Sequence, residues 1–188
     1  MIISISGKPG SGKSTVAKKI AEKLNYERYY MGGLRRQAAR EKGMTLAEYN
    51  RLGEKDFSTD KEVDEYLKKL GQKEDNFIIE GRTAFHFIPH SYKIFLDVEA
   101  EEGARRIFKD IKKGGAQRNE AKNLESLEDV LKANQERMRS DDFRYKKYYD
   151  LDIFNPKHYD LYLDTTNLSQ KNEFKKVFEA VKRTINKQ

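Results

Sequence analysis

Gly7-Lys8-Pro9-Gly10-Ser11-Gly12-Lys13-Ser14 matches the phosphate-loop pattern, in which two glycines, a lysine and a serine stand at fixed places. Glycines let the backbone curl so that its N–H groups point at phosphate oxygens, an approach that side chains would block. Lys13 can reach the β- and γ-phosphates, and the Ser14 hydroxyl can bind Mg²⁺. The pattern therefore predicts a site for a nucleoside triphosphate, which extends through Thr15.

The sequence on both sides of this loop supports the prediction. Residues 1–6 are a short β-rich run, and after the loop Val16, Ala17, Ile20, Ala21 and Leu24 recur at helical spacing. Strand, glycine loop and helix is the context that the pattern requires, and the dipole of the helix favours an anion at its N-terminus. A glycine turn that only resembles the pattern is the alternative, and these flanks disfavour it.

Length and composition predict one domain with a substantial core, since the 188 residues include eleven Tyr and ten Phe. The absence of Cys excludes disulfides and thiolate metal sites. No leader and no apolar run of membrane-spanning length is evident, so we expect a cytoplasmic protein. The net charge of +7 suits polyanionic substrates, nucleic-acid binding or simply a lysine-rich solvated surface, and does not decide among them.

Strand-like and helical patterns alternate along the chain. We expect strands over residues 1–6, 26–31, 76–80, 92–98 and 159–163, and helices over residues 34–42, 100–113, 126–149 and from Ser169 onward. Capping boxes at Thr45 and Thr59 predict two further helices, the second ending at Gly71. This alternation predicts an α/β fold of one domain, with a five-stranded parallel sheet and helices on both faces. Glycine-flanked polar stretches, residues 43–71 and 114–123, are expected to be mobile covers.

Charged residues follow the second and third predicted strands, at the edge where parallel sheets bind ligands. Arg36 follows the second strand, and Glu80-Gly81-Arg82 ends the third. Glu80 can orient Mg²⁺ through water, while Arg82 can reach a phosphate. The alternatives are an ordinary exposed helix residue for Arg36 and a charged strand end for the other two.

A third group, Arg137, Asp141 and Arg144, shares one face of a predicted helix at spacing i, i+4 and i+7. It combines cations that suit phosphate with a carboxylate that can accept from an exocyclic amine. A salt-bridged solvent face is the alternative. Because arginine suits planar, bidentate oxyanion recognition, the three groups together favour phosphoryl transfer to a small phosphorylated acceptor.

With these blocks the chain resembles the cytidylate kinases, most closely their compact archaeal-type form. The resemblance spans nearly the whole chain and rests on residues 6–15, on Tyr30-Met31-Gly32-Gly33-Leu34-Arg35-Arg36, on Glu80-Gly81-Arg82 with Ile88-Pro89 and residues 93–96, on Arg137, Asp141 and Arg144, and on residues 164–169. Two positions depart from the pattern. Thr83 stands where many bacterial relatives carry aspartate, and Met31 stands where serine or threonine often precedes the first acceptor glycine.

The resemblance implies the three-layer α/β/α fold of P-loop NTPases, with a helical section around residues 32–75 that binds the nucleoside monophosphate and a lid around residues 112–125. It implies catalytic roles for Lys13, Arg82, Arg137 and Arg144. The implied acceptor-binding residues are Gly32, Gly33, Arg36, Arg82, Arg137, Asp141 and Arg144, and the implied Mg²⁺ ligands are Ser14 and Glu80. Arg105, Arg106 and Arg118 are candidates for lid contacts to the transferring phosphate.

The implied reaction transfers the γ-phosphoryl group of ATP to CMP or dCMP, with Mg²⁺, in a monomer that binds small molecules and neither membrane nor nucleic acid. Thr83 and Met31 keep open a kinase for UMP or AMP, and the net charge keeps open a nucleotide-binding regulator or nucleic-acid-associated ATPase. His86, His90 and His158 share no ligand spacing, which disfavours a zinc site. Tyr145, Tyr148 and Tyr149 are expected to form a packing face.

Overall fold

The computed structural model describes residues 1–114 and 124–186. Its five strands form one sheet in the order β2-β3-β1-β4-β5, and every pair of neighbours is parallel, as predicted. The strands are β1 (Ile3–Gly7), β2 (Glu27–Tyr30), β3 (Phe77–Glu80), β4 (Tyr92–Asp97) and β5 (Leu161–Asp164). The central strand β1 is buried along its whole length, because helices cover both of its faces.

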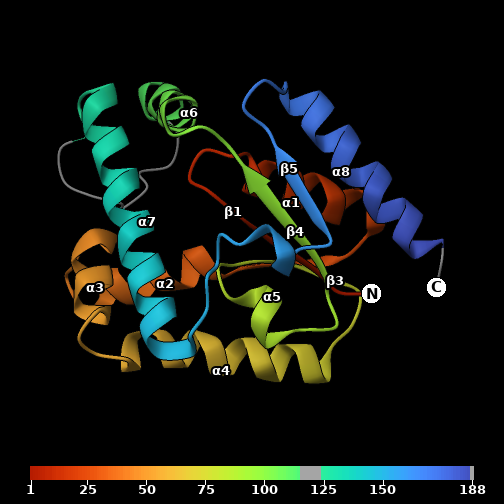
Figure 1. The fold of residues 1–188 in the computed structure, drawn as a ribbon, viewed down its shortest axis with the longest axis horizontal. Helices are drawn as coiled ribbons and strands as arrows, with labels where there is room; N and C mark the ends of the chain where they lie inside the picture. The colour runs from red at the N-terminus through yellow and green to blue at the C-terminus, as the bar shows by residue number, and fades with distance from the viewer. Residues whose placement is uncertain (115–123, 187–188) are drawn as a thin grey trace.

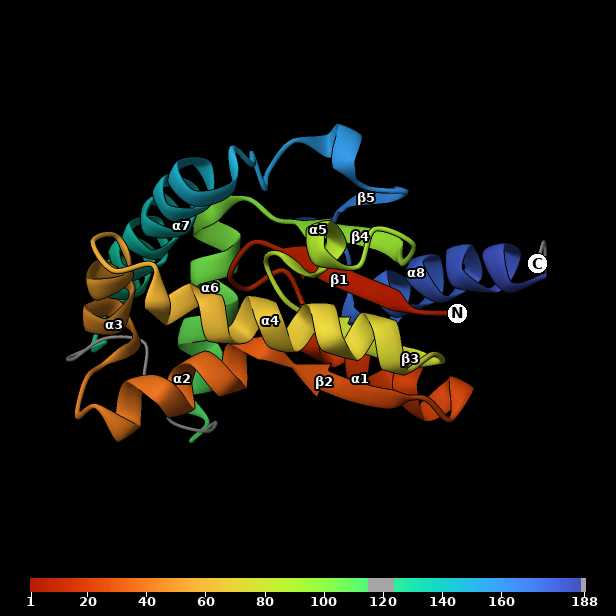
Figure 2. The ribbon, with the colours of Figure 1, turned by 90° about the horizontal axis from the view of Figure 1, so that it is seen from below.

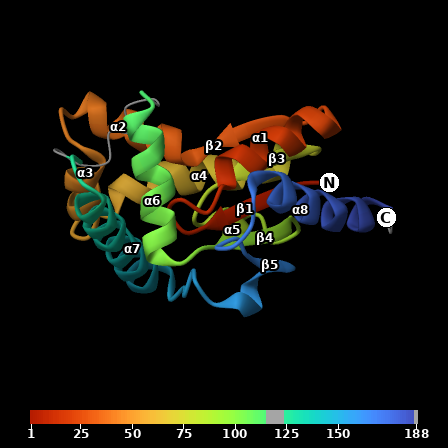
Figure 3. The ribbon, with the colours of Figure 1, turned by 90° about the horizontal axis from the view of Figure 1, so that it is seen from above.

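The helices alternate with the strands. They are α1 (Lys13–Leu24), α2 (Met31–Glu41), α3 (Leu46–Gly53), α4 (Ser58–Lys73), α5 (Ala84–Phe87), α6 (Ala100–Lys112), α7 (Leu127–Tyr149), the 3₁₀ helix η1 (Pro156–His158) and α8 (Gln170–Ile185). Helices α2, α3, α6 and α7 gather beyond the carboxyl ends of the strands (Figures 1 and 3). No helix in the described ranges is long and apolar enough to span a bilayer.

Two apolar clusters hold the layers together. On one face, Val16 and Ile20 of α1 and Val177 of α8 pack against β1, β3 and β4. On the other face, Leu67 and Leu70 of α4 pack with α5 against β2 and β3, and Figure 2 shows α4 lying across that side of the sheet. Because each cluster joins helices to the same sheet, residues from distant parts of the sequence meet at the sheet's carboxyl edge.

Helix starts differ from the sequence prediction in two places. The capping box at Thr45 is confirmed, but α4 begins at Ser58 without a side-chain cap and continues past Gly71. Thr59 does not cap it, because its hydroxyl lies inside the protein and donates to the carbonyl oxygen of Asp56 at 3.1 Å. The four-residue helix α5 was not predicted, since so short a helix shows no periodicity.

The second difference concerns Gly32 and Gly33, which were expected to end the second strand. Instead α2 starts at Met31, so both glycines lie in its first turn. The Tyr30 ring covers them, and a Cβ on either glycine would lie 2.9 Å from a ring carbon. Glycine therefore lets the Tyr30 ring pack closely here, and the chain passes directly from β2 into α2.

Candidate active site

The phosphate loop joins β1 to α1 and is held open by backbone conformations that suit glycine. Gly10 and Gly12 have φ angles of 78° and 87°. A Cβ on Gly10 would lie 2.2 Å from the carbonyl oxygen of Gly103 in α6, so the apex of the loop is packed against that helix. Across the loop, Nζ of Lys13 donates to the carbonyl oxygen of Lys8 at 2.7 Å. The lysine thus lies over the concave side of the loop, where a phosphate would sit.

Two basic residues fasten the loop to its surroundings. Nζ of Lys8 lies 2.7 Å from Oδ1 of Asp97 at the end of β4. Arg106 of α6 donates to the carbonyl oxygen of Gly10 at 3.4 Å and to that of Thr165 at 2.7 Å. Arg106 therefore ties the loop apex to the turn after β5.

Two other arginines, Arg105 and Arg118, were predicted to contact the transferring phosphate from the lid. Arg105 is exposed and pairs with Glu102 of its own helix. Arg118, with most of the predicted lid, lies outside the described residues.

One cavity brings most of the predicted residues together. Its walls include Pro9, Gly10, Lys13 and Ser14 of the phosphate loop, and also Gly32, Arg35, Arg36, Glu80, Arg82, Arg137 and Asp141. Arg36 is held by its own neighbours, since its Nη1 donates to the Tyr30 hydroxyl at 2.7 Å and to the Gly32 carbonyl at 2.8 Å. We call this space, which lies between the phosphate loop and these arginines, the acceptor cavity.

Arg82 and Arg144 are joined through Asp141. Nε of Arg82 donates to Oδ2 of Asp141 at 3.0 Å, and Nη2 of Arg144 donates to Oδ1 at 2.5 Å. Arg144 also pairs with Asp60, and its side chain is completely buried. The predicted catalytic residue Arg144 thus lies behind the cavity wall, where it supports Asp141 and Asp60.

The charges in this network stabilise one another. Burial alone would raise the pKa of Asp141, but Arg82 and Arg144 lower it below its ordinary value. For Arg82, burial lowers the pKa of the guanidinium and Asp141 opposes this effect. The lowered pKa keeps Asp141 ionised at neutral pH, and its negative charge favours the charged form of Arg82.

Glu80 and Ser14 fit the chemistry of a magnesium site. Oε1 of Glu80 accepts from Nε of Arg28 at 2.5 Å, while its Oε2 is buried and has no hydrogen-bond partner among the described residues. Ser14 lines the same cavity in the first turn of α1. Mg²⁺ commonly takes one or two protein oxygens together with waters and substrate phosphates, so these two side chains could hold it.

Sequence reasoning missed several residues of this site. Asp60, Asp64 and Arg35 line the acceptor cavity, and Gly103 supports the loop. Burial raises the pKa of Asp64 to about 6. Asp60, Asp64 and Leu67 follow one another at spacing i, i+4 and i+7, so their position on the buried stripe of α4 was a signal available in the sequence.

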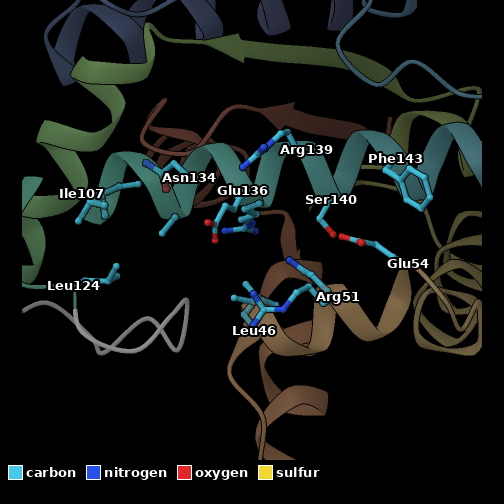
Figure 4. A pocket seen from close by; sticks show the side chains of 15 residues that line it. Leu46, Arg51, Glu54, Ile107, Leu124, Asn134, Glu136, Arg139, Ser140 and Phe143 are labelled. Atoms are coloured by element: carbon cyan, nitrogen blue, oxygen red, sulfur yellow. The ribbon is translucent and has the colours of Figure 1, made fainter. Parts of the chain in front are cut away.

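A second pocket lies between α3 and α7 (Figure 4). Arg51 on α3 and Glu54, which directly follows that helix, point toward Glu136 and Ser140 on α7. The pocket shares Asn50, Ile107 and Arg137 with the acceptor cavity, so the two spaces adjoin. Of these two spaces, the acceptor cavity is the one that residues of the phosphate loop line. The loop also borders a third pocket, which Gly12, Thr15 and Arg106 line.

A phosphate loop on a parallel sheet, facing a cavity lined by guanidinium groups, defines a phosphate-loop kinase. The model of the cytidylate kinase-like family matches residues 2–167, and the chain belongs to that family. It is 36% identical over 184 residues to a cytidylate kinase of Methanocella arvoryzae, and the matched region covers 96% of this chain and 97% of that protein. It is 32% identical over 182 residues to a cytidylate kinase of Archaeoglobus fulgidus, which covers 96% of this chain and 94% of the other.

Solved structures agree on the fold. A shikimate kinase from Acinetobacter baumannii superimposes with a TM-score of 0.60 at 16% identity, over 97% of this chain and 93% of that one. This likeness shows the architecture alone, because the identity is low.

Proposed function

We propose that the protein transfers the γ-phosphoryl group of ATP to CMP or dCMP, giving ADP and CDP or dCDP. Its family makes it an ATP-dependent nucleoside monophosphate kinase. One observation supports the proposal most strongly: the phosphate loop and the side chains of Arg36, Arg82 and Arg137 line the same cavity. A single triphosphate on the loop does not need these arginines, so they support a second phosphate.

The donor triphosphate would lie along the loop, with backbone N–H groups and Lys13 on its oxygens. An oxygen of the acceptor phosphate attacks the γ-phosphorus, the bond from that phosphorus to the β–γ bridging oxygen breaks, and ADP leaves. The attacking phosphate is already ionised near neutral pH, so no strong general base is required. Catalysis comes from positioning and from neutralising charge by Lys13 and the arginines.

On the acceptor side, Arg36, Arg82 and Arg137 would bind the monophosphate, while Asp141 holds Arg82 in place. Gly32 and Gly33 let the first turn of α2 pack under Tyr30, which in turn fixes Arg36. Arg144 would contribute through Asp141 and Asp60. These roles agree with an acceptor-binding section around residues 32–75.

Mg²⁺ would be bound by the Ser14 hydroxyl and, through water, by Glu80. When bound, it would neutralise charge on the β- and γ-phosphates. Arg106 fixes the donor side of the loop, and the segment around residues 112–125 would close over the site and exclude water. We further propose that the enzyme works in the cytoplasm as a monomer.

The test is an acceptor panel: ATP-Mg²⁺ with CMP, dCMP, UMP, AMP or GMP, with ADP release measured in a coupled assay. We expect turnover with CMP and dCMP well above that with the other acceptors. Preference for UMP or AMP would overturn the acceptor assignment. Turnover of none of them, together with tight binding of RNA or DNA, would overturn the kinase proposal itself.

A further inference from the structure

Four carboxylates line the acceptor cavity: Asp60, Asp64, Glu80 and Asp141. Arginines already pair with three of them, and the partner of Glu80 is Arg28. Both oxygens of Asp141 accept from arginines, and Oδ1 of Asp60 accepts from Nη1 of Arg35 at 2.8 Å as well as from Arg144. Carboxylates used in this way hold the arginines, and their charge is already balanced by these cations.

Asp64 has a different environment. It lies in the middle of α4 with 4% of its surface exposed, and its Oδ1 accepts from Oγ1 of Thr83 at 3.1 Å. Its Oδ2 accepts from the hydroxyl of Tyr149. Both partners are neutral hydroxyl groups. They orient the carboxyl group from two sides, but they do not cancel its charge.

This environment favours a ligand that donates a hydrogen bond. Because the pKa of Asp64 is raised to about 6 by burial, the group is mostly ionised at neutral pH. Arg35 acts on the charge of Asp64 from a distance, but no ion pair with Asp64 is found among the described residues. A buried carboxylate in this position is costly, and each of its oxygens can accept more than one hydrogen bond. An N–H or O–H group from a ligand would offset part of that cost.

The position of Asp64 indicates which part of the acceptor it meets. Its partner Thr83 directly follows Arg82, which would bind the acceptor phosphate. Asp64 therefore lines the same cavity as Arg82, close to the place proposed for the acceptor. Cytosine carries an exocyclic amine at its position 4, where uracil carries a carbonyl oxygen. A carboxylate accepts from the amine and repels the carbonyl oxygen.

We propose that Asp64 selects cytosine over uracil by accepting a hydrogen bond from the exocyclic amine, and that Thr83 and Tyr149 position it for this contact. The proposal rests on the proposed function, since it requires a pyrimidine monophosphate as acceptor. It assigns base selection to α4, whereas the sequence had pointed to Asp141 on α7.

The decisive variant is Asp64→Asn, which preserves the shape of the side chain and replaces one acceptor oxygen with an N–H₂ donor. In assays with ATP we expect the ratio of kcat/KM for CMP to kcat/KM for UMP to fall at least about tenfold. The value for dCMP should fall in parallel with that for CMP. Calorimetric binding of CMP and UMP without ATP should show the same change in preference.

Asp60→Asn is the matched control, because Asp60 lies one turn earlier on α4 but is held by arginines. We expect this variant to weaken CMP, dCMP and UMP alike. Equal losses for all three acceptors in Asp64→Asn would show a merely structural role and overturn the proposal. A loss for CMP without a loss for dCMP would assign Asp64 to the ribose hydroxyl and also overturn it.

The wild-type protein separates this proposal from the proposed function. If it fails to phosphorylate CMP, the function is wrong. If it prefers CMP and Asp64→Asn keeps that preference, the function stands and the assignment of Asp64 is wrong.

Discussion

Nε of Arg82 lies 3.0 Å from Oδ2 of Asp141, although 59 residues separate the two in the sequence. Arg82 also donates to the carbonyl oxygen of Gly7, where β1 enters the phosphate loop. Asp141 on α7 in turn holds Arg144. This pair therefore connects the loop that would bind ATP to the helix that walls the acceptor cavity.

Asp141→Ala should damage the whole site, because it leaves Arg82 and Arg144 buried without their shared carboxylate. We expect a loss of about 3–5 kcal/mol in the free energy of unfolding in urea. The value of kcat/KM should fall by a similar factor for every acceptor. The control is Asp142→Ala, which removes an ion pair with Lys146 on the surface of α7 and should cost less than about 1 kcal/mol. A changed base preference with normal stability would instead show that Asp141 reads the base.

Lys13→Ala should abolish most turnover while the fold persists, since the lysine lies over the loop and contacts its backbone. We expect kcat to fall by a factor of at least about 10²–10³, as when one preorganised donor to a transition state is lost. Circular dichroism and the melting temperature should stay close to wild type. Lys18→Ala, at an exposed position on the same helix, should leave kcat unchanged. Normal turnover in Lys13→Ala would remove the loop from the mechanism.

Glu173 makes stability depend on pH. It is buried in α8 against Gly12, and burial raises its pKa to about 7. Because this pKa is higher in the folded than in the unfolded chain, its favourable contribution is complete below about pH 4 and is lost as the pH rises through about 7.

Glu173→Gln should therefore stabilise the protein at pH 8 relative to wild type, by roughly 1–3 kcal/mol, and much less at pH 5. Urea unfolding at the two pH values measures this difference. Glu179→Gln, at an exposed position on the same helix, should show no such dependence. The idea fails if the effect of Glu173→Gln is the same at both pH values.

Gly103→Ala tests the packing of α6 on the phosphate loop. A Cβ there would lie 2.5 Å from the carbonyl oxygen of Pro9, a backbone atom that cannot easily move. Alanine favours a helix by about 1 kcal/mol over glycine, but overpacking costs about 1–3 kcal/mol. We expect weaker binding of ATP, measured by calorimetry, with little change in the affinity for CMP. Unchanged affinity for ATP would contradict the packing argument.

The sequence predicted the parallel sheet and the phosphate loop because both depend on local patterns. Apolar runs, helical spacing and glycine positions are visible without tertiary structure. Arg36, Arg82, Arg137 and Asp141 were also found, and the structure places them in one cavity.

What could not be predicted depends on packing between distant segments. The burial of Arg144 arises from its ion pairs with Asp60, 84 residues away, and with Asp141. The environment of Asp64 depends on hydroxyl groups from α7 and from the turn after β3. Gly103 has no motif of its own, and its role becomes apparent only where α6 contacts the loop.

The central claim is that a phosphoryl group is transferred from ATP to CMP within one cavity. The most direct measurement is a ³¹P NMR time course of ATP and CMP incubated with the enzyme and Mg²⁺. We predict resonances of ADP and CDP that grow together in equal amounts, without inorganic phosphate. Formation of ADP and inorganic phosphate without CDP would show hydrolysis instead of transfer, and would contradict the account.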